Sequence, residues 1–180
     1  MATNTLETHV LKDTTEHAII KLTGYFDGTG GQENDHFRIK ANTLYGALAT
    51  NGFPVVNAAG YSANTPLSYY NLAVSRIWYD CDTTGEVSLF WHADTVSYIM
   101  HLNGNGEYDG MGNWITIPNT AKLAGTANAI GDIGVVTRGM IANSVYTVIV
   151  EVRKDNAHYS RGQFNDPAAF NYGSNYTLRP

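Results

Sequence analysis

The sequence predicts an all-β domain: an antiparallel two-sheet sandwich, jelly-roll-like, with one short helix and extended terminal arms. The length of 180 residues is enough for one domain with a full hydrophobic core. The 18 glycines, the 12 tyrosines and the frequent Asn and Thr suit turns and pleated surfaces, and only 15% of the residues are charged. Several windows alternate apolar and polar side chains, which is the period of a half-buried strand.

The first two predicted strands span residues 17–26 and 37–41. In the first, Ala18, Ile20 and Leu22 share one side while polar side chains take the other. The second strand alternates in the same way, so both are expected to place one face on a core.

Residues 42–50 form the only predicted helix. Asn42 is its expected N-cap, and Leu44 and Leu48 are spaced to face inward. Gly46 in its interior limits the helix to about two turns.

The next 21 residues, 51–71, are rich in Asn, Ser, Gly and Pro and predict a long surface loop. Three predicted strands follow at residues 72–79, 86–93 and 96–102. Their short connections have turn composition, so the three strands are expected to form an antiparallel meander.

Glycine-rich residues 103–113 predict another loop, followed by a short strand at 114–117 that Pro118 ends. Residues 119–131 are small and polar and also predict a loop. The last two predicted strands are expected to pair across the turn GMIAN and span residues 132–138 and 145–154. The total is about eight or nine strands.

This organisation divides the chain into an N-terminal arm (1–14), a sandwich domain (15–155) and a C-terminal arm (156–180). Disordered tails are poor in aromatic residues, whereas the C-terminal arm has several, so we expect it to be buried against a partner. Tyrosines in the loops are also typical of protein interfaces. The residues predicted to contact a partner are Leu6, Val10, Tyr61, Tyr69, Tyr70, Tyr159, Phe164, Phe170, Tyr172 and Tyr176.

Several function classes are not expected. The net charge of −5 and the scattered basic residues argue against nucleic acid as a partner. The longest apolar runs fall short of the roughly 18 residues that a membrane span needs, and the N-terminus has no secretion-signal pattern. The single Cys81 is expected to be a buried apolar residue, and the sequon at Asn175 carries little weight without secretion. No cofactor is predicted.

Catalysis and metal binding are weaker hypotheses. His92 and His101 lie on neighbouring predicted strands, where Asp94 and Ser97 could complete a hydrolase constellation, but Ser97 lacks a nucleophile elbow, and an enzyme is not expected. Two loops have alternating oxygen-bearing side chains that could wrap Ca²⁺, but neither has the Glu that ends an EF-hand, so turns are favoured. These loops are residues 27–35 and 103–109.

A glycan-binding module is the remaining alternative to protein contact. Aromatic rings in loops can stack on sugars as well as on protein surfaces. The candidate rings are Tyr61, Tyr69, Tyr70, Tyr108 and Trp114.

Four stretches of the chain resemble a group of small virion structural proteins of tailed bacteriophages, chiefly phages of cyanobacteria and other aquatic hosts. They are residues 11–24, 40–48, 131–154 and 162–171. The resemblance implies a particle component with no cofactor and no catalytic residues, made in the host cytoplasm and located in the virion.

Among virion roles, the low charge and the two arms favour a capsid decoration (cement) protein that binds the major capsid protein, other copies of itself, or both. A neck, tail or fibre component is the alternative.

Overall fold

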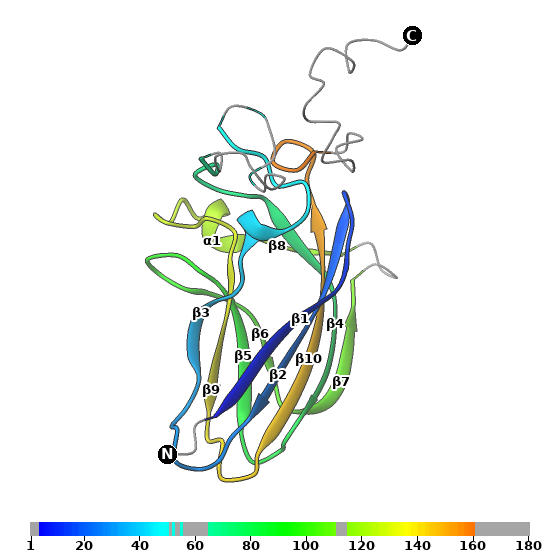
Figure 1. The fold of residues 1–180 in the computed structure, drawn as a ribbon. Helices are drawn as coiled ribbons and strands as arrows, with labels where there is room; N and C mark the ends of the chain where they lie inside the picture. The colour runs from blue at the N-terminus through cyan, green and yellow to red at the C-terminus, as the bar shows by residue number, and fades with distance from the viewer. Residues whose placement is uncertain (1–3, 51, 53–54, 56–64, 111–114, 161–180) are drawn as a thin grey trace, which may run out of the picture.

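The computed structural model describes residues 4–50, 52, 55, 65–110 and 115–160. It confirms the all-β sandwich: two antiparallel sheets face each other, with one short helix, α1 (Thr120–Leu123), at one end (Figure 1). The larger sheet has the order β1 (Thr5–Asp13), β2 (His17–Tyr25), β10 (Val145–Lys154), β4 (Leu72–Cys81), β7 (Gly104–Asp109), with β8 (Ile117–Pro118) also on β4. The smaller sheet has the order β3 (Asn34–Ile39), β9 (Ile133–Arg138), β5 (Glu86–Trp91), β6 (Ser97–Leu102).

The strand pairing is that of a jelly roll. Leaving aside β1 and β8, the first strand pairs with the last, the second with the next to last, and so inward: β2 with β10, β3 with β9, β4 with β7, and β5 with β6. A long antiparallel ribbon that is rolled up in this way gives two packed sheets. This order agrees with the jelly-roll-like sandwich expected from the sequence, although the sequence pattern does not fix the order itself.

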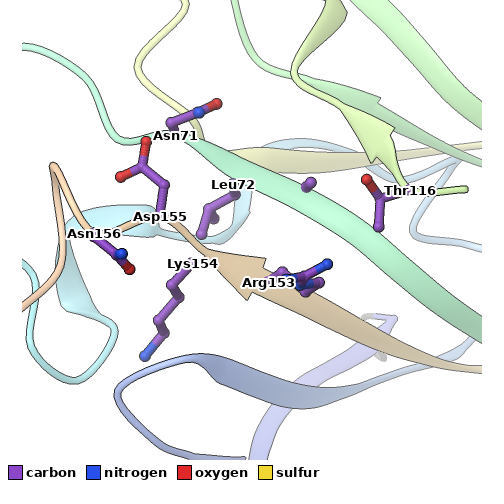
Figure 2. Close-up of a pocket in the computed structure, with 8 residues that line it drawn as sticks. Asn71, Leu72, Thr116, Arg153, Lys154, Asp155 and Asn156 are labelled. Carbon is purple, nitrogen blue, oxygen red and sulfur yellow. The ribbon is translucent and has the colours of Figure 1, made fainter. Parts of the chain in front are cut away.

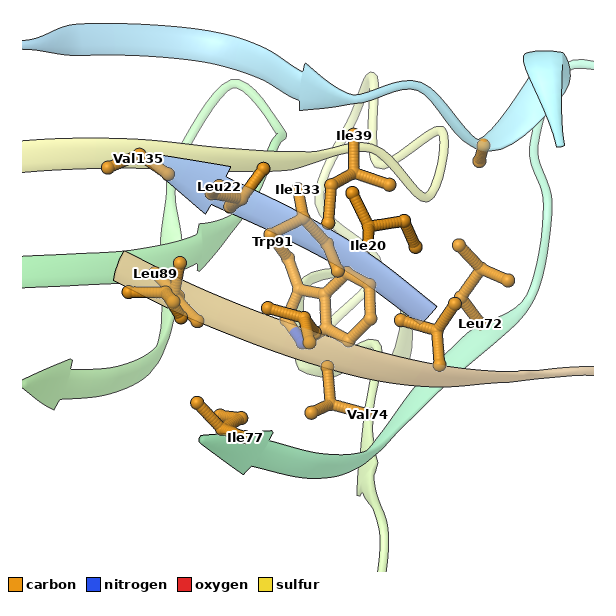
Figure 3. Packing of buried hydrophobic residues seen from close by; sticks show 14 of the residues in the cluster. Ile20, Leu22, Ile39, Leu72, Val74, Ile77, Leu89, Trp91, Ile133 and Val135 are labelled. Carbon is orange, nitrogen blue, oxygen red and sulfur yellow. The ribbon is translucent and has the colours of Figure 1, made fainter. Parts of the chain in front are cut away.

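The core lies between the two sheets, and the alternation in the sequence explains it. Along β2 the side chains are buried at every second residue, and β10 repeats the pattern. Trp91 is fully buried at the centre of this layer (Figure 3). Around it lie apolar side chains of both sheets, among them Ile20, Leu22, Val74, Ile77, Leu89, Ile133 and Val135.

A buried ion pair ties the two sheets together along one side. Arg38 on β3 lies 3.1 Å from Glu33 (Nε to Oε1), and both side chains are at most 5% exposed. The Arg38 guanidinium also donates to the backbone carbonyls of Glu7 and Thr23 in the larger sheet. Burial raises the pKa of Glu33, against the lowering effects of the hydrogen bond from Tyr146 and the charge of Arg38.

A second buried cation closes the other end of the sandwich. The Lys154 amine is fully buried and donates to the Asp13 carboxylate and to the carbonyls of Thr14 and Tyr45, the latter two at 2.7 and 2.9 Å. Burial lowers the pKa of Lys154, while Asp13 raises it. The end of β10 is thereby fixed to the end of β1 and to the segment after β3.

Two predicted strand pairings are wrong. β4 and β5 do not form a meander, and β9 does not pair with β10, because each of these consecutive strands lies in a different sheet. Only β5 and β6 form the expected hairpin. Turn composition is the same for a hairpin as for a connection between sheets, so the sequence pattern could not separate them.

The predicted helix at 42–50 is also wrong. The structure has only a 3₁₀ turn, η1 (Ala41–Thr43), which ends where Leu44 is extended (φ −70°, ψ 147°). Gly46, with a φ of 78°, is also outside helical conformation. The helix α1 instead lies in the predicted loop 119–131, where the Asn119 side chain accepts the Lys122 N–H at 3.0 Å. Residues 104–109, predicted as loop, are the edge strand β7.

The boundaries of the predicted arms change as well. Most of the described part of the N-terminal arm is strand β1, which pairs with β2 on both sides of a bulge at Leu11 and so belongs to the sandwich. Residues 156–160 belong to it too, because His158, Tyr159 and Ser160 are buried. The rest of the predicted C-terminal arm lies outside the described residues.

Candidate binding surface

The outer face of the smaller sheet has a continuous row of six rings, which we call the ring row. Phe90 is 2% exposed yet stands on the opposite side of β5 from the core residues Leu89 and Trp91. From it the contacts run both ways, to His36 at 5.1 Å and to Tyr98 at 6.2 Å between ring centroids. The row in spatial order is Phe37, His92, His36, Phe90, Tyr98, His101.

Two local features of the backbone build the ring row. A β-bulge in β3 sets residues 36–38 against Gly134, so His36 and Phe37 reach the outer surface while Arg38 turns inward. Gly134 has no side chain, and a β-carbon there would lie 2.3 Å from Cζ of Phe90. Because residue 134 is glycine, the Phe90 ring can lie flat against the sheet and contact the His36 ring.

His36 and His92 contact each other through like atoms. Their Nδ1 atoms are 3.2 Å apart, and their ring planes are at 86°. Burial lowers the pKa of His92, and the nearby His36 lowers it further, while Asp132 and Asp94 act in the opposite direction. In this contact one Nδ1 atom donates and the other accepts, so a single proton lies between the two rings.

The other end of the ring row is polar. His101 Nδ1 lies 2.7 Å from Ser88 Oγ and 3.0 Å from Glu86 Oε1, and Ser88 Oγ donates to the same carboxylate oxygen at 2.6 Å. The Ser88 hydrogen bond and then His101 lower the pKa of Glu86. A Ser–His–acid relay needs the serine on one imidazole nitrogen and the acid on the other, whereas here both contact Nδ1.

The hydrolase constellation considered from the sequence is not assembled. His92 contacts His36, and His101 contacts Ser88 and Glu86. Ser97 Oγ lies 2.6 Å from Thr120 Oγ1. Asp94 accepts a hydrogen bond from Asn128 at 2.6 Å. These side chains have separate partners.

The edge strand β1 presents a second surface. Among the described strands it pairs with β2 alone, so its other edge could take a strand of a partner chain, although Arg38 already donates to the Glu7 carbonyl and accepts from Thr8. Val10 and Leu11 are both 55% exposed, next to a bulge between Val10 and Lys12. Leu6, also predicted to contact a partner, packs partly against the core instead.

Two of the predicted contact residues belong to the core. Tyr70 and Tyr159 are 2% and 0% exposed, and their hydroxyl groups donate to the carbonyls of Leu48 and Ala41. Their polar neighbours in the sequence favour a surface position, but the two rings fill the end of the sandwich. The other predicted rings, Tyr61, Phe164, Phe170, Tyr172 and Tyr176, lie outside the described residues, as does Trp114.

Tyr69 is half-buried at the same end of the molecule. Its ring centroid lies 4.4 Å from that of His158, and the Lys122 amine sits 3.9 Å from the ring centroid on another side. The cation–π contact and the imidazole hold the ring in a fixed orientation. Of the predicted contact tyrosines that the structure describes, Tyr69 is the one left partly accessible.

A polar pocket of about 290 Å³ lies near this end, between the start of β4 and the end of β10 (Figure 2). The Lys154 amine is committed to Asp13. The Asp155 carboxylate binds the His158 ring at 2.7 Å and the backbone N–H groups of Ala157 and His158. Two of the charged groups that line the pocket are thus already bonded within the fold.

In each of the two loops considered for Ca²⁺, an acidic side chain binds other groups of the protein. Asp27 accepts the backbone N–H groups of Thr29 and Gly30 at 2.8 and 3.0 Å, and these bonds lower its pKa. In the second segment Asp109 binds Arg76. Within the described ranges, no three His, Cys, Asp or Glu side chains gather as a metal-ligand group.

Comparison with known proteins gives no assignment: no family model, no curated protein and no solved structure matches the chain. No helix in the described part of the chain is long and apolar enough to cross a membrane. The class that fold and surface define is a jelly-roll domain with an outward row of rings.

Proposed function

We propose that this chain is a non-enzymatic structural protein of a tailed-phage virion, and specifically a capsid decoration protein that binds and stabilises major capsid subunits. The observation that carries the proposal is the ring row: six rings held on a rigid sheet, facing outward. Aromatic side chains that are already held in one conformation before binding lose little side-chain entropy when a protein surface docks on them.

Both the exposure and the composition of the ring row are typical of a surface that contacts another protein. Phe37 and Tyr98, toward its two ends, are 44% and 41% exposed, while the rings between them are packed together. Tyr and Phe are enriched in interfaces, and a docked neighbour would remove apolar area from water at both ends.

The fold gives weaker, associational support. Jelly rolls recur in viral capsid proteins and also in lectins, so the fold alone does not choose between them. The resemblance of four stretches of the chain to virion structural proteins favours the first. A neck, tail or fibre component is the alternative, and it would use the same surfaces to contact subunits of a different symmetric assembly.

Glycan binding is the second candidate, and one observation favours it. The exposed Tyr98 ring lies beside groups that can bond sugar hydroxyls, with Arg138 donating to its hydroxyl at 3.5 Å and the His101 ring at 4.8 Å. Binding of the purified chain to a glycan array, lost in Tyr98→Ala, would support this function over capsid contact.

Localisation in purified particles tests the proposal. Cryo-electron microscopy of virions with a tag on this chain should place it on the capsid surface. Density at the neck or tail would replace the decoration role with the alternative, and absence from purified particles would contradict both.

Surface variants test which residues make the contact. Phe37→Ser and Leu11→Ser should each lower occupancy on particles. The free energy of unfolding should change by no more than about 0.5 kcal/mol for Leu11→Ser and by about 0.5–1.5 kcal/mol for Phe37→Ser, which loses its ring contact with His92. Leu123→Ser is the matched control, because Leu123 is 74% exposed and lies on α1, which is part of neither surface. Equal occupancy of all three variants would reject these surfaces as the contact.

A further inference from the structure

The contact between His36 and His92 has the geometry of a metal-ligand pair. His36 is on β3 and His92 follows β5, with β9 between these two strands, so the pair joins segments that are far apart in the sequence. The Nδ1 atoms face each other at 3.2 Å. Two imidazole nitrogens on a tetrahedral zinc ion, each at about 2.0–2.1 Å, lie roughly 3.3–3.4 Å apart.

We propose that His36 and His92 form a binding site for a divalent transition-metal ion, coordinated by the Nδ1 atoms of both side chains. This inference concerns the chemistry of the pair alone and does not depend on the proposed role in the virion. An ion between the two nitrogens needs their separation to grow by only about 0.1–0.2 Å. It also displaces the proton of the hydrogen bond, which moves to Nε2 of the donor ring, and the rings turn so that both Nδ1 lone pairs meet at the ion.

The surroundings fit imidazole ligands. Histidine binds metals through the lone pair of a neutral imidazole nitrogen. The hydrogen bond between the two Nδ1 atoms means that at least one of them already presents its lone pair to the other. The aromatic rings of Phe37 and Phe90 flank the pair at centroid distances of 4.6 and 5.1 Å and fix the orientation of the two imidazoles.

The nearby charges are mixed. Asp94 and Asp132 are close enough to act on His92, and their negative charge favours a cation. Lys40, whose amine is 6.0 Å from the Phe37 ring centroid, acts against it. The two carboxylates and the one amine together give this position a small net negative charge, which favours a bound cation weakly.

The site supplies two protein ligands. No third His, Cys, Asp or Glu joins them among the residues that the structure describes. Both rings are partly exposed, so water or a side chain of a neighbouring molecule could fill the remaining coordination positions. Imidazole ligands select Zn²⁺, Ni²⁺ and Cu²⁺ over Mg²⁺ and Ca²⁺.

Zinc titration of the full chain tests the site. Isothermal titration calorimetry near neutral pH should show one saturable zinc ion per chain, with affinity at least about tenfold lower in His36→Gln and in His92→Gln. His101→Gln is the matched control, because His101 lies on the same ring row but bonds Ser88 and Glu86 instead. Circular dichroism confirms that each variant is folded.

Imidazole NMR gives a second readout that does not depend on the variants. Zinc should shift the Nδ1 resonances of His36 and His92 together and leave those of His101 in place. Zinc affinity that is unchanged in the double variant His36→Gln/His92→Gln would overturn the proposal. Loss of zinc binding in His101→Gln, or no saturable binding by the native chain, would overturn it equally.

Discussion

The ring of Phe90 lies directly on Gly134 of the neighbouring strand. A β-carbon at residue 134 would stand 2.3 Å from Phe90 Cζ and 2.7 Å from the carbonyl oxygen of Asp35. The whole ring row depends on this contact, because His36 reaches Phe90 and His92 only where β9 has no side chain.

We predict that Gly134→Ala destabilises the protein by about 1–3 kcal/mol, since the added methyl group overpacks a fully paired strand. The φ of Gly134 is not in the left-handed region, so the cost is steric. Chemical denaturation measures it. In a Phe90→Ala background the same substitution should cost less, because the ring is gone and only the contact with Asp35 remains. An equal cost in both backgrounds would contradict this account.

The buried pair of Arg38 and Glu33 leads to a second prediction. Arg38→Met should cost about 3–5 kcal/mol at neutral pH, because it leaves the Glu33 carboxylate buried without its cation. The double variant Glu33→Gln/Arg38→Met should recover much of this loss. Urea unfolding of the three proteins checks it, and a double variant no more stable than Arg38→Met would be the contrary result.

The same pair has a pH signature. Burial already raises the pKa of Glu33 above its unfolded value, and removal of Arg38 raises it further. A carboxyl group with a raised folded pKa binds more protons in the folded state, so stability falls as pH rises through that window. The cost of Arg38→Met should therefore be smaller at about pH 5 than at about pH 8.

How far the sequence predicts this fold depends on the strand. The range of β10 is predicted to the residue, and those of β2, β5, β6 and β9 within about two residues, because their apolar side chains alternate over the core. β7, with the sequence GNGEYD, has no such alternation, because it lies at a sheet edge and buries few side chains. Its strand conformation comes from pairing with β4, and a local sequence pattern does not show a partner so far along the chain.

The contact between His36 and His92 is also hard to predict, because it too depends on pairing between distant strands. The alternation correctly places His92 on the polar side of its strand, but His36 lies one residue before the predicted strand 37–41. The bulge in β3 brings the two together, and a bulge depends on the partner strand β9. The available signal is Gly134 within an otherwise apolar strand, a position that often marks a bulge or a close approach.

Alkaline pH gives a third prediction through Cys81, which is 4% exposed at the end of β4. Burial, with Asp80 as a second cause, raises the pKa of Cys81 from 9.0 to about 12. The folded thiol then stays protonated where the unfolded thiol ionises. The stability that this gives is complete below about pH 9 and is lost as pH rises toward 12.

Cys81→Ala should remove this dependence. Between about pH 9 and pH 11 the free energy of unfolding of the native chain should fall more steeply than that of the variant, by about 1.4 kcal/mol per pH unit. Buried tyrosines such as Tyr146 and Tyr159 change in the same direction in both proteins, so the difference isolates the thiol. Parallel pH profiles, measured with reductant present, would contradict the prediction.

Two truncations separate the folding role of the C-terminal segment from its proposed binding role. Tyr159 is fully buried, and its hydroxyl donates to the carbonyl of Ala41 at 2.9 Å. The Ser160 N–H donates to the carbonyl of Gly46 at 2.7 Å. Deleting residues 156–180 removes these contacts and should cost about 3–5 kcal/mol, as expected for the loss of a buried aromatic side chain.

Deleting only residues 161–180 should leave the unfolding temperature unchanged, because every described core residue remains, and yet abolish occupancy on virions if the segment binds the capsid. Thermal denaturation and quantitative mass spectrometry of purified particles measure the two effects separately. Tyr159→Phe is the control: it removes one buried hydrogen bond, should cost about 1 kcal/mol, and should leave occupancy intact. Normal occupancy of the 161–180 deletion would show that capsid contact runs through the ring row and β1 instead, because those are the surfaces that the shortened chain keeps.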